Sequence, residues 1–391
     1  MVTISASSLA AVERAFEENF RSRAELGASV SIWQHGREVL SLASGFTNRE
    51  RSQAWTQETL VPVWSATKGP AALATVYAWM EARLSPETPI SDAWLEFVGG
   101  GKADITFSQL MSHTAGLYGL TERVPIFDFD GVIRALEHQQ PLHEPGSQQG
   151  YHARTFGFLL DEIVRRLSGL ESLGEFFHEV FGAPMDLDFW IGLPQRKWGC
   201  VATLYPGKFS LEPRDPQFQK ALTTPGSATA LAFATPVGLH AVADMNQPET
   251  WQRGYPAMGG VGSASGLAKL YAMLADGGRW QGEQVVSETI LKLLETGISE
   301  SADDLVLRLP CAFSHGMMKD PIDPETGSKF RQLFGPSRRA YGHAGAGGSL
   351  AFADPENGIS FAYVMNQMEL GILPGRKALS LVEALYSDVS G

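Results

Sequence analysis

The sequence predicts an α/β plus all-α fold: an antiparallel sheet flanked by helices and built from both ends of the chain, with an inserted helical lobe. Residues 27–33 and 38–45 are apolar and β-branched on either side of a Gly-containing turn, which is typical of a β-hairpin. Strand-like runs return at 348–353 and 358–366. Between these two parts the chain has the 3.6-residue period of amphipathic helices. The two ends are therefore expected to share one sheet.

Helices are expected before and after the first hairpin. The N-terminal segment is amphipathic and should start a helix near Ser7 or Ser8. From Trp64 onward, apolar residues recur at helical spacing, at Leu73, Val76, Tyr77 and Met80. Pro70 fits this second helix only in its first turn. Ser65 is therefore expected at or near a helix N-terminus.

The middle of the chain is expected to be helical and its later part rich in loops. Further helices are predicted to open near Ile105 and to run over 155–167. Between about 195 and 256 the pattern weakens into Pro, Gly, Gln and aromatic residues, which favours long loops over a cleft. A helix near 263–276 and a final helix from about 374 restore the α/β character.

We divide the chain into a discontinuous α/β domain, 1–62 and 257–391, and a mostly helical domain with long cleft-covering loops, 63–256. A chain of 391 residues is long enough for two lobes with a large core. Its 44% of hydrophobic and 19% of charged residues exclude disorder as the dominant state.

Charge and hydropathy argue against two classes of partner. The chain has 31 Lys and Arg against 43 Asp and Glu, a formal net charge of −12 at pH 7. Neither nucleic acid nor an anionic membrane is therefore expected to bind. No segment has the pattern of a secretory signal or about 18 consecutive apolar residues, so a soluble, cytoplasmic protein is expected. The oligomeric state stays open.

The tetrapeptide Ser65-Ala66-Thr67-Lys68 has the pattern of a nucleophile with its base. Residues i and i+3 share one face of a helix, so Lys68 can direct its amine at Ser65 Oγ. The helix N-terminus offers N–H groups to a developing anion. A lysine desolvated in a dry cleft can take the serine proton, because burial lowers its pKa. The alternative is that Ser65 and Lys68 are ordinary surface residues without a catalytic role, but the residues before Ser65 are apolar.

With its neighbours this motif resembles serine β-lactamases, penicillin-binding proteins and the family VIII carboxylesterases related to class C β-lactamases. The resemblance extends over most of the chain. It rests on several segments together, among them TLVPVWSATKG, ITFSQLMSHTAGL, PGSQQGYHARTFGFLLDEIVRRLSG and YGHAGAGGSLAFADPENG. It implies a β-lactamase/transpeptidase-like fold and a serine hydrolase that works through an acyl-enzyme and needs no cofactor.

The second motif of the class C relatives, Tyr-x-Asn, is altered here. Tyr151-His152-Ala153 matches it by position, and the resemblance implies that Tyr151 joins Lys68 in moving the serine proton. A phenol can act as a base only if a neighbouring cation, here Lys68, favours the phenolate. Ala153 replaces the asparagine that holds a β-lactam amide, which weakens the case for β-lactam recognition. A buried tyrosine bonded to backbone is the alternative interpretation of Tyr151.

The third motif of the β-lactamases, Lys-Thr-Gly, is absent, and His343-Ala344-Gly345-Ala346 stands in its place. The resemblance implies an oxyanion hole formed by the backbone N–H groups of Ser65 and Ala346. Without the lysine, a β-lactam carboxylate lacks its cation, which favours neutral esters. His343 and Gly345 are expected to contact substrate, with a structural role as the alternative for His343.

Two further residues complete the set of candidate substrate-binding residues. Tyr118 and Trp251 lie in expected cleft loops and are candidates for substrate binding. The histidines show no spacing typical of metal ligands, and Cys200 and Cys311 are too far apart in sequence to suggest a metal site or a disulfide scaffold. No metal is therefore expected, and both cysteines are expected to be packing residues.

The sequence thus predicts a serine carboxylesterase that hydrolyses short-chain carboxylic esters, with Ser65 as nucleophile and Lys68 and Tyr151 moving its proton to the leaving alcohol. A β-lactamase, a D-amino-acid peptidase or amidase, or an acyltransferase would use the same residues. A catalytically silent sensor or binding protein is the alternative of another class. The absence of Gly-x-Ser-x-Gly argues against an α/β-hydrolase.

Overall fold

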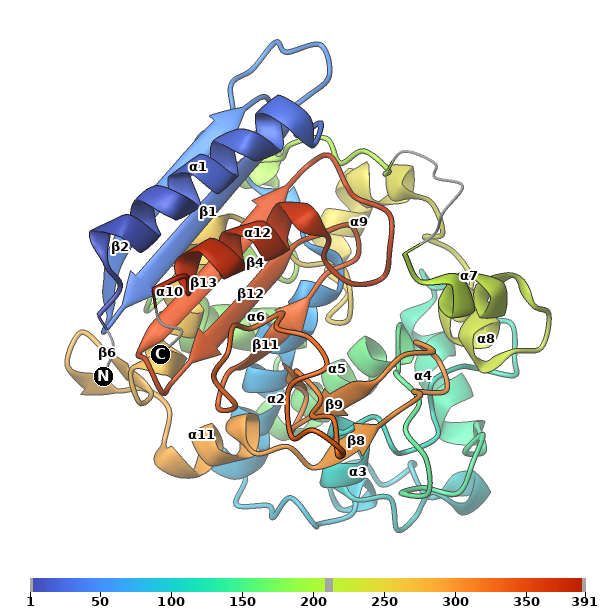
Figure 1. Cartoon of the computed structure of the whole chain (residues 1–391). Coiled ribbons are helices and arrows are strands. Elements are labelled where there is room, and N and C mark those ends of the chain that lie inside the picture. Colours follow the sequence, from blue (N-terminus) through green and yellow to red (C-terminus); the bar gives the residue numbers. More distant parts are fainter. Residues whose placement is uncertain (1–2, 208–213, 389–391) are drawn as a thin grey trace.

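A large antiparallel sheet forms the centre of the computed structural model, which describes residues 3–207 and 214–388 (Figure 1). Within these ranges the sheet has eight strands in the order β2-β1-β13-β12-β11-β10-β9-β8. Their bounds are β1 Gly27–Gln34, β2 Arg37–Gly45, β8 Ser299–Ser301, β9 Cys311–Phe313, β10 Met318–Lys319, β11 Tyr341–Ala344, β12 Leu350–Asp354 and β13 Ile359–Met365. The two ends of the chain meet where β1 pairs with β13, with Val30 opposite Tyr363. The predicted fold class is confirmed.

Three helices cover the two faces of this sheet. They are α1 Ala6–Ser22, α10 Ala264–Ala275 and α12 Arg376–Leu385. Because successive residues of a strand point to opposite faces, Phe352 and Phe361 pack in the core under α1 and α12, whereas Ala351 and Ala362 pack in the core that includes α10. Helix α1 begins slightly earlier than predicted, because Ser5 caps it by accepting the N–H of Ser8.

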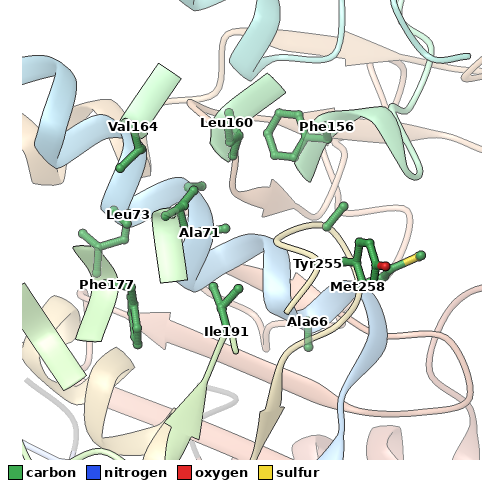
Figure 2. Close-up of a cluster of buried hydrophobic side chains, with 14 of the residues drawn as sticks. Ala66, Ala71, Leu73, Phe156, Leu160, Val164, Phe177, Ile191, Tyr255 and Met258 are labelled. Carbon is green, nitrogen blue, oxygen red and sulfur yellow. The ribbon is translucent and has the colours of Figure 1, made fainter. Parts of the chain in front are cut away.

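The inserted lobe is built around α2, which packs against α5 and α6. Figure 2 shows Ala71 and Leu73 of α2 in one buried cluster with Leu160 and Val164 of α5 and with Phe177 of α6. The helices of this lobe are α2 Lys68–Glu81, α3 Phe107–Met111, α4 Phe129–His138, α5 Thr155–Ser168, α6 Leu173–Phe177, α7 Pro216–Thr223, α8 Ala228–Ala234 and α9 Pro248–Arg253. This core fixes the helix whose N-terminal end carries Ser65.

A small sheet of β3, β5 and β4 contains, in β3, the strand that directly precedes the Ser65 turn in the chain. Its strands are β3 Val61–Pro62, β4 Phe189–Trp190 and β5 Val261–Gly262; the remaining elements are β6 Arg279–Trp280, β7 Glu283–Gln284 and α11 Glu288–Glu295. The small sheet takes β3 and β5 from the predicted α/β domain and β4 from the predicted helical domain. The division at 62/63 and 256/257 therefore stays a proposal.

The segment 195–256 was predicted to consist of long loops, but the structure has helices there. Its described part contains the short helices α7, α8 and α9, while residues 208–213 lie outside the described ranges. Pro216 and Pro248 stand in the first turns of α7 and α9, and Ser227 caps α8. Helices of six to eight residues are too short for their apolar period to stand out in the sequence.

Two smaller expectations can be compared with the described residues. Cys311 is buried in β9 as a packing residue, but Cys200 is exposed, so the expectation of a packing role is wrong for Cys200. Neither of them forms a disulfide. Among the helices of the described ranges, none has the length and apolar character needed to cross a membrane.

Candidate active site

Ser65 is presented by a strained turn. It lies in the 3₁₀ helix Trp64–Thr67, which runs directly into α2. The preceding residue, Trp64, has a φ of 50°, a left-handed conformation that costs a non-glycine residue on the order of 1–2 kcal/mol. Thr67 holds the turn: its Oγ1 donates to Trp64 O at 2.5 Å and accepts the N–H of Gly260 at 2.9 Å. The surrounding structure thus fixes the position of the Ser65 side chain.

Lys68 is fully buried and has no acidic partner within the described residues. Its Nζ lies 2.8 Å from Ala257 O, 2.9 Å from Ala153 O and 3.4 Å from Ser65 Oγ. Burial lowers the pKa of Lys68 well below its usual value. A neutral amine has two N–H groups for the two carbonyls and one lone pair for the Ser65 hydroxyl. Lys68 is therefore placed to take the Ser65 proton.

Tyr151 completes the group. The Ser65 side chain is within hydrogen-bonding reach of its phenol, and Lys68 Nζ lies 4.7 Å from the centre of its ring. Burial raises the pKa of Tyr151, and Lys68 is not among the groups that lower it. The expectation that a cationic Lys68 favours a phenolate is therefore wrong. Burial thus lowers the pKa of the Lys68 amine and raises that of the Tyr151 phenol, so Lys68 is the better proton acceptor and Tyr151 can donate a proton.

The candidate oxyanion hole depends on a close approach of two turns. Within the described chain, the N–H groups of Ser65 and Ala346 donate to no protein acceptor, whereas Gly345 N donates to Ser349 O at 2.7 Å. A Cβ on Gly345 would lie 2.1 Å from Val63 O, so only glycine lets the turn after β11 approach the Ser65 turn this closely. Ser65 and Ala346 line the same cavity. Two unused donors of this kind can hold an oxyanion.

Gly345→Ala should damage this oxyanion hole without removing the Ser65 hydroxyl or the Lys68 amine. The added methyl must displace the backbone at Val63 or at 345, which moves the Ala346 N–H. We expect kcat for the ester p-nitrophenyl butyrate to fall about 10²–10³-fold, the cost of losing one oxyanion donor. Steady-state kinetics checks this, with Gly199→Ala as control, because a Cβ there meets open space. An equal loss in both variants would contradict the assignment.

A cavity of about 950 Å³ opens beside Ser65 and Ala346. Its wall is mostly apolar and comes largely from α7, α8 and the segment that follows α8. The large apolar members of this wall are Trp64, Phe218, Leu222, Phe233, Leu239, Val242, Met258, Met368 and Ile372. Among the described residues that line it, Arg154 and Lys220 carry full charges and none is an Asp or Glu. Arg154 donates to the carbonyls of Phe233 and Gly238, which ties the wall to the Tyr151 segment.

The four residues predicted to bind substrate do not line this cavity. His343 is fully buried in β11, and Gly345 packs against the Ser65 turn. Tyr118 belongs to the core that lies under α1 and α12 and also includes Tyr151, whereas Trp251 packs against a small separate cluster. Packing accounts for the position of each of them, and the prediction that they contact substrate stays a prediction.

Three buried histidines surround Tyr151 without charge. Burial lowers the pKa of His152 and of His343 to about 3, and it lowers the pKa of His113 well below its usual value. The ring of His113 lies 4.9 Å and that of His343 6.1 Å from the Tyr151 ring. At neutral pH these rings pack against the phenol as neutral groups, so His343 is not a triad base.

Comparison with known proteins agrees with this geometry. The model of the family described as Beta-lactamase matches residues 12–381. The chain belongs to the β-lactamase family. It is 28% identical to the esterase/β-lactamase LipL of Mycobacterium tuberculosis. The matched region has 369 residues and covers 92% of this chain and 81% of LipL. A solved family VIII carboxylesterase is similar with a TM-score of 0.86 at 32% identity, over 99% of both chains.

A penicillin-binding protein homologue from Caulobacter crescentus is also similar, with a TM-score of 0.84 at 32% identity over 99% of both chains. The predicted superfamily is thereby confirmed. This member of the β-lactamase family is a serine hydrolase with a β-lactamase/transpeptidase-like fold.

The pH dependence of this β-lactamase-family chain should reflect Lys68. A protonated Lys68 cannot accept the Ser65 proton, so kcat/KM should rise with pH and level off well below pH 10.5, the usual pKa of lysine. The histidines around Tyr151 are already neutral there. His343→Gln should therefore leave the acid limb of the profile in place. A profile measured with p-nitrophenyl butyrate checks this, and a limb that moves in His343→Gln would contradict it.

Two residues of this site in the β-lactamase family member were missed at the sequence level. Arg154 follows Ala153 directly, but its role depends on carbonyls some 80 residues later, from Phe233 to Leu239. Asp304 accepts the backbone N–H of Tyr151 from the opposite lobe. Neither residue stands in a motif. Both are identified by hydrogen bonds between segments that are far apart in the sequence, and such bonds cannot be predicted from the spacing of residues along the chain.

Proposed function

We propose that the chain is a serine carboxylesterase that hydrolyses short-chain carboxylic esters through an acyl-enzyme. The observation that carries the proposal is the fully buried Lys68 amine, whose pKa is lowered by burial and whose Nζ lies 3.4 Å from Ser65 Oγ beside a mostly apolar cavity. Relatives named as esterases support it. The same catalytic residues can act on other acyl groups, so we infer the substrate class from the shape and polarity of the cavity.

The proposed reaction begins when Ser65 Oγ attacks the ester carbonyl while its proton passes to Lys68. The N–H groups of Ser65 and Ala346 hold the oxyanion. As the bond to the alcohol oxygen breaks, Tyr151 gives its phenolic proton to the leaving group and regains one from the Lys68 ammonium. Water then attacks the acyl-enzyme and gives its proton to Lys68, and the Lys68 ammonium returns that proton to Ser65 Oγ as the acyl–oxygen bond breaks and the carboxylic acid leaves.

The cavity favours neutral esters with a small apolar acyl group. Its wall is mostly apolar, and the Arg154 guanidinium is already engaged by loop carbonyls rather than free to bind a carboxylate. Ala153 lines the cavity, so position 153 offers a methyl group in place of the side-chain amide that would hold a β-lactam amide. Both features favour an ester over a β-lactam as substrate.

A substrate panel tests the proposal. Purified chain is assayed with p-nitrophenyl acetate, butyrate and octanoate, with nitrocefin and with D-alanyl p-nitroanilide. We expect the highest kcat/KM for the short esters. Faster turnover of nitrocefin or of the D-alanyl amide would move the chain to one of those classes. A fluorophosphonate that labels wild type and Ser65→Ala equally would show that the nucleophile assignment is wrong, and a wild type that is not labelled would favour a catalytically silent binding protein.

Phe233→Ala should enlarge the acyl-binding part of the cavity. Phe233 lines the wall and packs edge-on against Phe218, with ring centres 5.3 Å apart. Each buried methylene is worth about 0.8 kcal/mol, so the ratio of kcat/KM for hexanoate over butyrate should rise about threefold to tenfold. Phe330→Ala, a change at a half-exposed ring outside the wall, is the control. An unchanged ratio in Phe233→Ala would mean that the acyl chain lies elsewhere.

A further inference from the structure

Asp304 is a fully buried carboxylate in the connection between β8 and β9. Its Oδ1 accepts the N–H groups of Val306 and Leu307, both at 2.9 Å, which closes its own turn. The same carboxylate also reaches into the other lobe, where it accepts the N–H of Tyr151 at 3.1 Å and the Nε2–H of Gln149 at 3.0 Å. One side chain therefore holds its own turn and the segment that carries the candidate proton donor.

This carboxylate has no basic partner within the described residues. None of the ion pairs of the described chain includes Asp304, and burial raises its pKa while the N–H bonds lower it. A buried charge without a counter-ion is costly, and it persists where hydrogen bonds compensate. Closing the local turn needs only one acceptor atom, which a serine can supply. The second oxygen and the reach to Tyr151 are therefore in excess of what the turn requires.

The backbone at Tyr151 is also held by its neighbours. Leu305 N donates to Gln149 O at 3.0 Å, and Val306 O accepts the hydroxyl of Thr229 in α8 at 2.7 Å. The turn of Asp304 thus contacts both the Tyr151 segment and a helix of the cavity wall. Because Tyr151 is in a loop before α5, these bonds replace the fixed geometry that a helix or strand would give it.

We propose that Asp304 is a positioning residue for Tyr151: its carboxylate fixes the backbone N–H of Tyr151 so that the phenol stays within reach of Ser65 and can protonate the leaving alcohol. The inference rests on the proposed esterase function and adds a role that acts through Tyr151 alone. With this role, the two steps of acylation depend on different residues. Attack by Ser65 depends on Lys68 and the oxyanion hole, whereas departure of a poor leaving group depends on the position of Tyr151.

Leaving-group dependence tests this role. Alkyl alcohols need a proton to depart, whereas p-nitrophenolate and fluoride leave without one. Asp304→Ser keeps an acceptor for the local turn but cannot reach Tyr151. We expect it to lower kcat/KM for methyl butyrate about tenfold to 100-fold more than for p-nitrophenyl butyrate, in line with the loss of one general acid. Fluorophosphonate labelling of Ser65 should change by less than about threefold.

Asp304→Asn is the conservative variant. Its Oδ1 still accepts the Tyr151 N–H, and Gln149 can rotate its amide to present Oε1, which has no partner in the described chain, to the new NH₂ group. We expect both esters to stay within about threefold of wild type. Asp161→Asn, at a buried carboxylate that accepts the N–H of Leu173 in the helical lobe, is the matched control for a general loss of stability.

The outcomes are distinct. If Asp304→Ser lowers both esters and the labelling rate equally, as Asp161→Asn would if it loosened the fold, Asp304 is only structural and the inference is wrong. If Asp304→Ser does not fold, Asp304→Glu, which keeps the charge but displaces it by one methylene, must show the selective loss of methyl butyrate turnover. If wild type hydrolyses neither ester, it is the proposed function that fails, before any variant of Asp304 is compared.

Discussion

Ser65→Ala should lower kcat/KM for p-nitrophenyl butyrate roughly 10⁴-fold or more, because the substitution removes the hydroxyl that forms the acyl-enzyme. Lys68→Ala should cost a similar factor, since its buried amine lies 3.4 Å from Ser65 Oγ and is placed to take the proton. The double variant should lose little beyond either single variant, because residues that act as one unit are not additive. Steady-state kinetics on the three variants measures this.

The control for these variants is a measurement that each of them is still folded. Thermal unfolding of Ser65→Ala should stay close to that of wild type, because the substitution removes one oxygen atom at the cavity surface. If the losses of the two single variants multiply in the double variant, Ser65 and Lys68 act in separate steps. The shared role derived from their geometry would then be wrong.

Tyr151→Phe should act mainly on substrates with poor leaving groups. Without the phenol, methyl butyrate has no proton donor for its alcohol, so its kcat/KM should fall about 10²–10⁴-fold, the usual contribution of a general acid. For p-nitrophenyl butyrate, whose phenolate leaves unprotonated, the loss should be much smaller. Parallel kinetics with the two esters of the same acid measures this, since both form the same butyryl-enzyme.

Equal losses for the two esters in Tyr151→Phe would indicate a different role. Tyr151 would then act on Ser65 itself rather than on the leaving alcohol. Tyr255→Phe is a suitable control, because Tyr255 is another buried tyrosine of the helical lobe whose hydroxyl has no partner in the described chain. It should change both esters alike and only slightly.

The sequence predicted the parts of the fold that depend on long, regular patterns. The hairpin of β1 and β2, the helices α2, α5 and α10, and the return of the chain to the sheet at β12 and β13 all follow from apolar periods of adequate length. The strands β9 and β10 and the helices α7 and α8 span only two to eight residues. Their conformation is decided by what they pack against.

The same distinction applies to the site. Ser65 and Lys68 share one helical turn, so their pairing is local and spacing alone predicts it. The lowered pKa of Lys68 was predicted from its place in the motif, whereas the raised pKa of the Tyr151 phenol was not, because it comes from burial by distant segments. His343 shows the limit of position in a motif: it stands where a substrate contact was expected, but the fold closes over its ring.

The burial of Lys68 also links catalysis to the folding equilibrium. In the unfolded chain its amine has a pKa near the usual 10.5, whereas in the folded chain that pKa is well below this value. Folding at neutral pH therefore displaces the proton equilibrium of Lys68 toward release. As pH falls from 10.5 toward the folded pKa, this group lowers the free energy of unfolding by ~1.4 kcal/mol for each unit of the interval, and the penalty is constant below it. The amine that serves as a base is thus made by the rest of the chain, which must fold against the preference of Lys68 for its proton.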